Sequence, residues 1–163
     1  MASGELDPER LFSVLTRHGV EFIVIGGLAG TIHGSPIVTQ DLDIVHRRTP
    51  DNIERLLAAL DELGAYYRVQ AGKRIVAGRS HLEAPGSQLL RTDAGRLDLL
   101  GEAAGRGYED LLVDSDPVDL EGMSVHVVRL ETLIELKEAA DRDKDRWALP
   151  TLRALLRERG ATR

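Results

Sequence analysis

The sequence of 163 residues contains no cysteine. This absence excludes disulfide bonds, thiol nucleophiles and zinc sites built from cysteine thiolates. A chain without disulfides suits the reducing cytosol, and we therefore expect a cytoplasmic protein.

Long apolar runs are lacking as well. The most apolar stretch covers residues 22–32, and three glycines interrupt it: Gly26, Gly27 and Gly30. It is shorter than the roughly 18 residues that indicate a membrane span. The first eight residues have neither a basic start nor an apolar core, so we expect no secretion signal and no membrane association.

Positive charge is in short supply. Lysine and arginine number 21 against 27 aspartates and glutamates, which gives a net charge of −6. This balance argues against a broad nucleic-acid-binding face. A hydrophobic content of 42% and a charged content of 29% are ordinary for a globular protein. We expect one domain over residues 1–163, built around one core.

Periodicity and turn residues indicate alternating helices and strands. Helices or helical turns are predicted between Asp7 and Gly19, between Thr49 and Gly64, and over residues 28–33, 108–112, 130–140 and 144–159. Pro150 predicts a kink or a later start in the last helix. Strands are predicted over residues 21–25, 41–46, 65–69, 73–77, 88–91, 96–100, 118–120 and 124–128, the last two as a hairpin. This pattern predicts an α/β (α+β) fold: a mixed sheet with flanking helices over residues 1–129 and a helical tail over residues 130–163.

Two carboxylates alternate with apolar residues on the strand at 41–46. Successive side chains of a strand point to opposite faces, so Asp41 and Asp43 share one face while Leu42 and Ile44 enter the core. Adjacent carboxylates repel, and the pKa of one should rise unless a cation lies between them. Mg²⁺ prefers such oxygen ligands and commonly completes its shell with water and substrate phosphate. Solvated acids at a strand edge are the alternative interpretation.

A third acid, Asp98, is flanked by apolar residues on the predicted strand at 96–100. If that strand lies beside the first, Asp98 completes a three-carboxylate site, which can hold two ions. The alternative is that Asp98 pairs with an arginine such as Arg96 or Arg91.

Two glycines, Gly26 and Gly27, end the strand at 21–25 and lead into a helical turn. Glycines in this position let backbone N–H groups approach a phosphate, aided by the helix N-terminus. Tight packing of strand against helix would also select glycine here.

The order of these features resembles a known group. Gly26-Gly27 followed by Asp41-Leu42-Asp43 is similar to the glycine-glycine and acid-x-acid signature of the nucleotidyltransferase superfamily, the polymerase-beta-like fold. Small bacterial members akin to abortive-infection and toxin–antitoxin nucleotidyltransferases are the most similar. Their loop resembles residues 33–36 with Thr39, and their helical tail resembles residues 130–145 here.

The resemblance implies transfer of a nucleoside monophosphate from a nucleoside triphosphate to an acceptor hydroxyl, with release of pyrophosphate. It implies Mg²⁺ or Mn²⁺ at Asp41, Asp43 and Asp98, and phosphate contact by Lys137. The acceptor stays open among tRNA, a protein and a small molecule. Many members carry Gly-Ser where this chain has Gly26-Gly27, which leaves Thr31 or Thr39 as the hydroxyl beside the triphosphate.

Several residues of the same region have simpler interpretations. Lys137 could pair with Glu135 or Glu138 on its own helix, and Asp145 could cap a helix or pair with Arg142. Trp147 is more typical of tail packing than of a base-stacking platform, and His33 of a structural loop histidine.

Three functional hypotheses follow. The first is a metal-dependent nucleotidyltransferase with Asp41, Asp43 and Asp98 as catalytic residues and with Gly26, Gly27, Thr39 and Lys137 holding the nucleotide. The second is a catalytically silent module that binds nucleotide or a cognate partner protein, for instance as half of a toxin–antitoxin pair. The third is a structural module whose acids are solvated.

Overall fold

The computed structural model of the chain describes residues 4–69 and 72–161. Residues 1–3 of the segment considered for a secretion signal, and the last two residues of the predicted tail, lie outside these ranges. Within the described part, no helix combines the length and the apolarity needed to cross a membrane.

One seven-stranded mixed sheet forms the centre of the protein, with strand order β3-β4-β5-β2-β1-β7-β6. The pairs β2–β5 and β1–β7 are parallel, and the other neighbours are antiparallel. The strands are β1 (Phe22–Ile25), β2 (Asp41–His46), β3 (Tyr66–Tyr67), β4 (Ser87–Thr92), β5 (Gly95–Leu100), β6 (Ser115–Leu120) and β7 (Met123–Val128). The predicted mixed α/β fold is confirmed.

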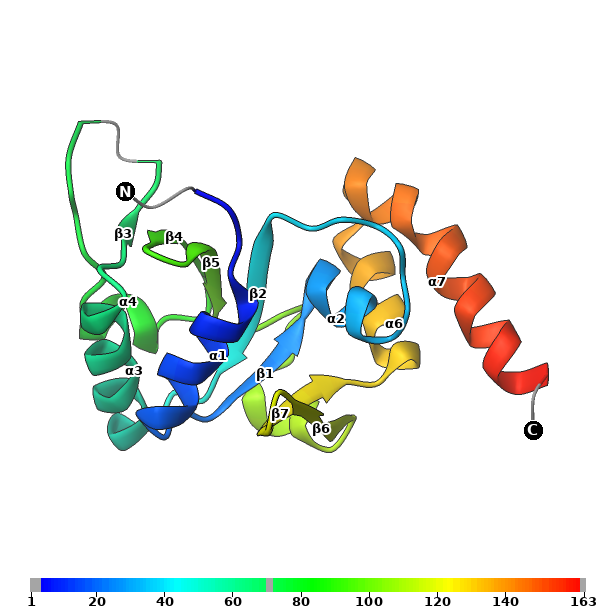
Figure 1. Cartoon of the computed structure of the whole chain (residues 1–163), viewed down its shortest axis with the longest axis horizontal. Coiled ribbons are helices and arrows are strands. Elements are labelled where there is room, and N and C mark those ends of the chain that lie inside the picture. Colours follow the sequence, from blue (N-terminus) through cyan, green and yellow to red (C-terminus); the bar gives the residue numbers. More distant parts are fainter. Residues whose placement is uncertain (1–3, 70–71, 162–163) are drawn as a thin grey trace.

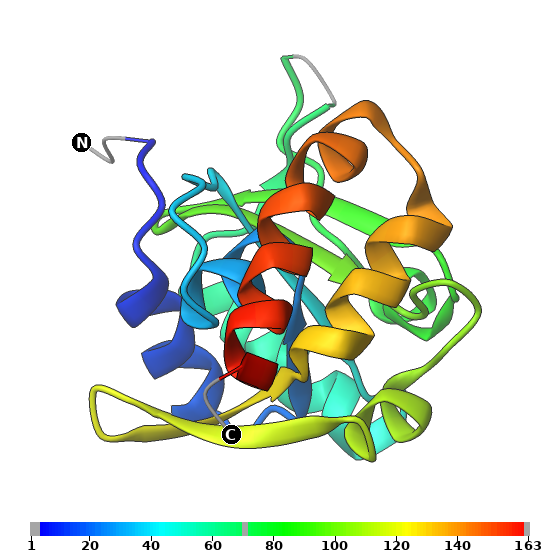
Figure 2. The same ribbon diagram turned by 90° about the vertical axis from the view of Figure 1, so that its right-hand side faces the viewer.

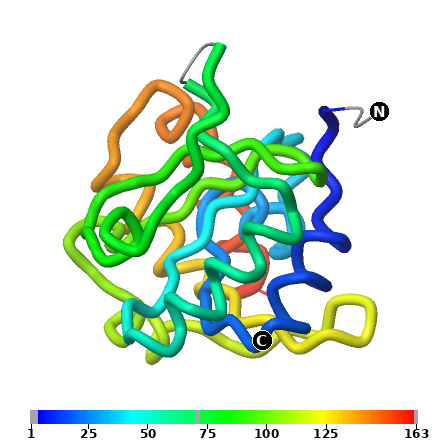
Figure 3. Tube along the Cα trace, turned by 90° about the vertical axis from the view of Figure 1, so that its left-hand side faces the viewer, coloured from blue at the N-terminus to red at the C-terminus, as the bar shows by residue number. Residues whose placement is uncertain are grey.

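Helices lie on both sides of this sheet (Figure 1). They are α1 (Pro8–Arg17), α2 (Gly26–Ile32), α3 (Pro50–Glu62), α4 (Arg79–Glu83), α5 (Tyr108–Leu112), α6 (Leu130–Ala140) and α7 (Asp143–Ala161). Figure 2 shows α6 and α7 side by side across one face, and they pack against each other. Figure 3 shows the opposite face, with α1 and α3 in front of the sheet.

Local sequence explains why the elements begin and end where they do. Asp7 caps α1 by accepting a hydrogen bond from the backbone N–H of Arg10 at 3.1 Å, and Pro8 follows in the first turn. The apolar face of α1 then buries Leu11, Val14 and Leu15 against the sheet. Burial of such a side chain stabilises a fold by about 1.5–3 kcal/mol, so this face anchors the helix.

The local structure differs from the predictions at three places. The predicted strand at 73–77 is irregular, and it joins the edge strand through the hydrogen bond from the Tyr67 N–H to the Ile75 carbonyl at 2.8 Å. The short helix α4 was not predicted, because its five residues carry too little periodicity. Pro150 does not delay α7, which already begins at Asp143: the proline is exposed while Leu149 and Leu152 pack inward.

Candidate functional site

The parallel pairing of β2 and β5 brings the predicted carboxylates to one place. Its register pairs Asp43 with Asp98 and Asp41 with Arg96. Leu42 and Ile44 are fully buried on the opposite face, as the alternation predicts. The structure therefore brings Asp41, Asp43 and Asp98 together, although they come from segments more than fifty residues apart along the chain.

Asp43 is the electrostatic centre of this group. Burial, together with the charge and hydrogen bonding of Asp98, raises the pKa of Asp43 from 3.8 to about 7. The positive charge of Lys144 opposes this shift, and the charge of Asp41 adds to it. In the absence of a cation, then, Asp43 shares the proton of a crowded acidic pair near neutral pH.

The Asp41 carboxylate carries an oxygen, Oδ1, that is buried and has no hydrogen-bond partner among the described residues. The guanidinium of Arg96 comes no closer to it than 3.8 Å. A buried carboxylate oxygen without a donor is costly, and a divalent cation would remove the cost. Oxygen-only donors on adjacent strands suit Mg²⁺ or Mn²⁺, so the residues present fit the expected metal.

Asp98 is held by an arginine, as one interpretation of the sequence expected, but by a different one. Arg68 donates to Asp98 Oδ1 at 2.6 Å and to the Leu90 carbonyl at 3.1 Å. Both side chains of this ion pair are largely buried. In this conformation no three acidic, histidine or cysteine side chains of the described ranges form a ready cluster of metal ligands. Asp98 would have to exchange Arg68 for an ion to join Asp41 and Asp43.

Both positions after β1 require glycine, because a neighbouring side chain lies close to the backbone at each. Gly26 has a φ of +69°, and a side chain on it would overlap the Asp43 carboxylate. A β-carbon on Gly27 would lie 2.9 Å from the Thr39 hydroxyl oxygen. The helix α2 begins at Gly26, two residues earlier than predicted, and no described side chain caps it. Its first backbone N–H groups therefore have no side-chain acceptor among the described residues, and Gly26 lies against the Asp43 carboxylate.

The Thr39 side chain occupies the space that a serine side chain at position 27 would need. Its hydroxyl donates to the Asp41 carbonyl at 3.1 Å and accepts from the Asp41 N–H at 3.4 Å. Thr31, the other candidate, bonds to the Gly27 carbonyl at 3.2 Å and lies on the exposed side of α2. Of the two threonines, Thr39 is the one that presents a hydroxyl beside the acids.

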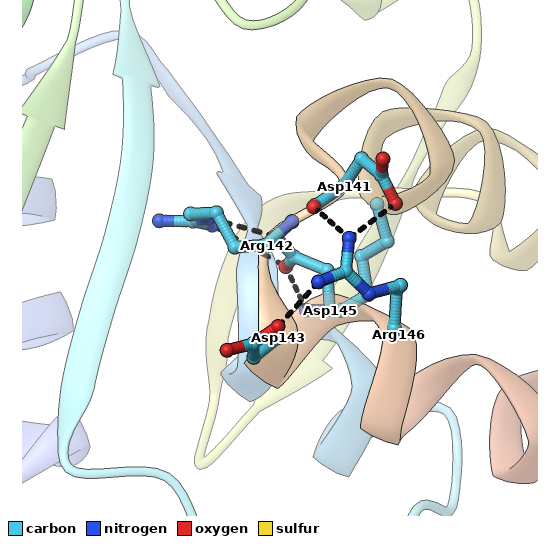
Figure 4. A network of polar contacts seen from close by, with 6 residues as sticks. Asp141, Arg142, Asp143, Asp145 and Arg146 are labelled. Carbon is cyan, nitrogen blue, oxygen red and sulfur yellow. Dashed lines mark hydrogen bonds and ion pairs between the residues drawn. The ribbon is translucent and has the colours of Figure 1, made fainter.

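The turn from α6 to α7 supplies the positive charge. Lys137 is nearly buried and pairs with Asp145 at 3.4 Å, so the interpretation that it pairs with Glu135 or Glu138 was wrong. Arg142 donates to the same carboxylate at 2.7 Å. Burial would raise the pKa of Asp145, but these hydrogen bonds and charges outweigh it and lower the pKa. Figure 4 shows this network and the separate, outer pairs that Arg146 makes with Asp141 and Asp143.

Two pockets meet at this site. The smaller, of about 200 Å³, we call the Thr39 pocket; its lining includes Gly27, Thr39, Asp41, Lys144 and Trp147. The larger, of about 370 Å³, we call the Asp98 pocket; its lining includes Gly26, Leu100, Asp98, Glu102 and Ala140. Three residues line both pockets: Asp43, Lys137 and Arg142.

Sequence interpretation missed three members of this site. Trp147 does not pack in the tail; its side chain is 69% exposed at the Thr39 pocket. Lys144 is exposed in the same pocket, and Arg68 reaches Asp98 from the far edge of the sheet. The exposed indole and lysine belong to the first turns of α7, which the sequence marked only as a helix. His33, by contrast, is a loop histidine as expected, bonded to the Val128 carbonyl at 2.7 Å.

Comparison with known proteins gives likenesses of structure. No protein-family model matches the chain, and no curated protein matches its sequence. The lincosamide antibiotic adenylyltransferase LnuA, solved with lincomycin bound, has a TM-score of 0.62 and 14% identity, over 93% of this chain and 99% of that one. TM1012 of Thermotoga maritima, described as a candidate nucleotidyltransferase, has a TM-score of 0.57 and 18% identity, over 96% and 98%. The chain is therefore a nucleotidyltransferase-fold protein.

Proposed function

We propose that this protein is a metal-dependent nucleotidyltransferase. It would transfer a nucleoside monophosphate from a nucleoside triphosphate to an acceptor hydroxyl and release pyrophosphate. The observation that carries the proposal is the position of Asp43: it lies beside Asp98, on the same strand face as Asp41, where the two pockets meet. A transferase needs this arrangement, because its two substrates must meet at the reacting phosphorus.

The Thr39 pocket is the proposed site of the triphosphate. Lys137, Arg142 and Lys144 line it, and cations of this kind stabilise phosphate charge. The N–H groups at the start of α2, which no described side chain caps, add hydrogen-bond donors, and the Thr39 hydroxyl would join them by turning its proton from the Asp41 carbonyl to the phosphate. The indole of Trp147, exposed at the rim, offers a face against which the nucleoside base can stack.

Asp41, Asp43 and Asp98 would hold Mg²⁺ or Mn²⁺. The bound ion supplies Lewis-acid polarisation of the phosphate and lowers the pKa of an attacking oxygen. The buried Asp41 oxygen and the raised pKa of Asp43 are the features that make this cation favourable. Binding is then linked to loss of the proton that Asp43 carries in the free protein.

The reaction uses the remaining groups for positioning. The acceptor oxygen attacks the α-phosphorus, a new oxygen–phosphorus bond forms, and the bond between the α-phosphorus and the β-bridging oxygen breaks. The acceptor proton passes to the Asp98 carboxylate and then to water. Pyrophosphate leaves along Lys137 and Lys144. Catalysis rests mostly on orientation and charge neutralisation, as in other phosphoryl-transfer enzymes.

The acceptor is the open part of this function. The neighbour LnuA is a lincosamide antibiotic adenylyltransferase, which favours a small molecule over the alternatives of tRNA or a protein. The second hypothesis, a silent nucleotide-binding module paired with a cognate protein, was motivated by the missing serine of the glycine motif. The Thr39 hydroxyl beside Gly27 supplies that group and weakens the motive.

Pyrophosphate release tests the proposal. The protein is incubated with Mg²⁺, each nucleoside triphosphate and pooled acceptors: RNA, protein and small alcohols. Asp43→Asn should lower release at least a thousandfold, because it removes the shared carboxylate while keeping its shape. Asp93→Asn, the same change at an exposed turn outside both pockets, should leave the rate unchanged. Nucleotide binding without release in the unaltered protein would favour the silent module instead.

A further inference from the structure

Both pockets have apolar side chains in their lining, but the Asp98 pocket adds acids where the Thr39 pocket adds a lysine and an indole. Leu89 and Leu100 of the sheet form one side, and Leu133 and Leu136 of α6 form the other. Alanines complete the lining where larger residues would close the space: Ala103, Ala104, Ala139 and Ala140. A cavity of about 370 Å³ that combines these apolar side chains with six charged ones has the size of a small-molecule site, for which volumes run from roughly 300 to 1,000 Å³.

The charges of the Asp98 pocket are already matched. Each charged side chain of its described lining has a partner of opposite sign, except Asp43, which lies at the proposed metal site. The ion pairs are Arg48–Glu102 at 3.2 Å, Arg68–Asp98 at 2.6 Å, Lys137–Asp145 at 3.4 Å and Arg142–Asp145 at 2.7 Å. The described lining of this pocket contains four acids and two cations, so it offers no net positive charge to the phosphates of a polyanion.

Macromolecular acceptors fit this pocket poorly. Single-stranded RNA is bound by a positive groove with aromatic side chains on which bases stack, and the described lining of the Asp98 pocket contains no aromatic residue. A serine or threonine side chain of a protein would leave most of the apolar walls uncovered. A compact organic molecule could instead bury its body against Leu100 and Leu136 while one hydroxyl reaches Asp98.

We infer that the Asp98 pocket is the acceptor site, and that the acceptor is a small organic alcohol with a largely apolar, uncharged or weakly cationic body. This inference rests on the proposed nucleotidyl transfer. The acceptor hydroxyl enters from this pocket, the triphosphate from the Thr39 pocket, and the two meet at Asp43. The product is a phosphodiester of the small alcohol, with pyrophosphate as leaving group.

A tryptophan at position 140 tests the assignment. Ala140 is exposed on α6 and shares a helix face with Leu133, Leu136 and Lys137, so the indole of Ala140→Trp would fill the pocket without disturbing the core. Ala58→Trp is the matched control, because Ala58 is exposed on α3 and lines neither pocket. The assay supplies Mg²⁺ and labelled nucleoside triphosphate together with tRNA, protein extract, or a panel of sugars, amino sugars and amino alcohols.

Label should appear on members of the small-molecule panel, as a mass increase of one nucleoside monophosphate. Ala140→Trp should reduce this transfer at least tenfold without changing the melting-temperature rise caused by the triphosphate, and Ala58→Trp should change neither. Label on RNA or protein would overturn the inference. The inference would also be overturned if no compound of the panel is labelled and none raises the melting temperature of the unaltered protein more than that of Ala140→Trp. A protein that shows no triphosphate-induced rise at all would contradict the proposed function instead.

Discussion

The two pockets share Asp43, Lys137 and Arg142, yet the residues around these three differ in kind. The Thr39 pocket adds an exposed lysine and an indole beside apolar side chains such as Val38 and Leu152. The Asp98 pocket adds leucines, alanines and acids that already have arginine partners. The comparison indicates that the carboxylates would set the place of the reaction, while the flanking side chains would determine which substrate binds in which pocket.

The shared residue gives the largest expected effect. As pH rises from about 4 to about 7, unfolded Asp43 releases its proton while folded Asp43 retains it, so the free energy of unfolding of the ligand-free protein falls. Above pH 7 both states are ionised, and this loss is complete. Asp43→Asn should therefore stabilise the metal-free protein by roughly 2–4 kcal/mol at pH 8 and by little at pH 4.

Urea unfolding at pH 4, 6 and 8 in the presence of a chelator measures this difference. Asp93→Asn, measured in parallel, controls for the loss of one negative charge. Parallel pH profiles for Asp43→Asn and the unaltered protein would mean that Asp43 is not the crowded acid described here.

The second effect belongs to the Asp98 pocket alone. Arg68→Gln removes the cation that holds Asp98 and should destabilise the metal-free protein by about 1–3 kcal/mol, because a nearly buried carboxylate loses its donor. Saturating Mg²⁺ should recover much of this loss, since the ion would replace the guanidinium. Chemical unfolding with and without Mg²⁺ measures both values. An equal loss under the two conditions would argue against Asp98 as a metal ligand.

The third effect belongs to the Thr39 pocket. Gly27→Ser should raise the dissociation constant of the triphosphate about tenfold, because its side chain would collide with Thr39, and Thr39→Ala should do so by loss of a hydroxyl. The double variant should bind better than the sum of the two losses predicts, since the new serine hydroxyl would occupy the vacated place. Titration calorimetry of the four proteins gives this cycle. If the two losses of binding free energy simply add in the double variant, the Thr39 hydroxyl does not replace the missing serine.

The smallest effect concerns the rim of the same pocket. Trp147→Ala should raise the KM for the triphosphate about five- to tenfold with little change in kcat, because it removes a stacking face. Arg146→Ala lies one residue away, but among the described residues Arg146 forms ion pairs with Asp141 and Asp143 and lines neither pocket, so the KM of this variant should stay constant. Equal values for the two variants would show that the indole does not meet the nucleotide.

The sequence predicted the centre of the molecule because local rules dominate there. The alternation of Asp41 and Asp43 with buried leucine and isoleucine marks a strand face, and the caps of α1 mark a helix. The grouping of Asp98 with Asp41 and Asp43 could also be predicted, on the condition that their two strands are neighbours in the sheet. Such features depend on short stretches of chain and on the period of each element.

The flanks of the site could not be predicted, because they depend on packing between distant segments. Arg68 reaches Asp98 only because β3 pairs with β4 at the sheet edge. Trp147 is exposed because Ala148, Leu149 and Leu152 form the buried side of α7, which turns the indole outward. A helical pattern alone gave the opposite expectation for this tryptophan. The edge segment at 73–77 likewise carries strand-like residues but joins the sheet by one hydrogen bond.

Thermal melts with Mg²⁺ and each nucleoside triphosphate test the central claim most directly, comparing the unaltered protein with Asp41→Asn/Asp43→Asn. A ligand of the folded state raises the melting temperature by mass action. The account predicts a rise of roughly 5–10 °C at a hundredfold excess over Kd, dependent on Mg²⁺ and absent from the double variant. No rise with any triphosphate at saturation, or an equal rise in the double variant, would contradict it.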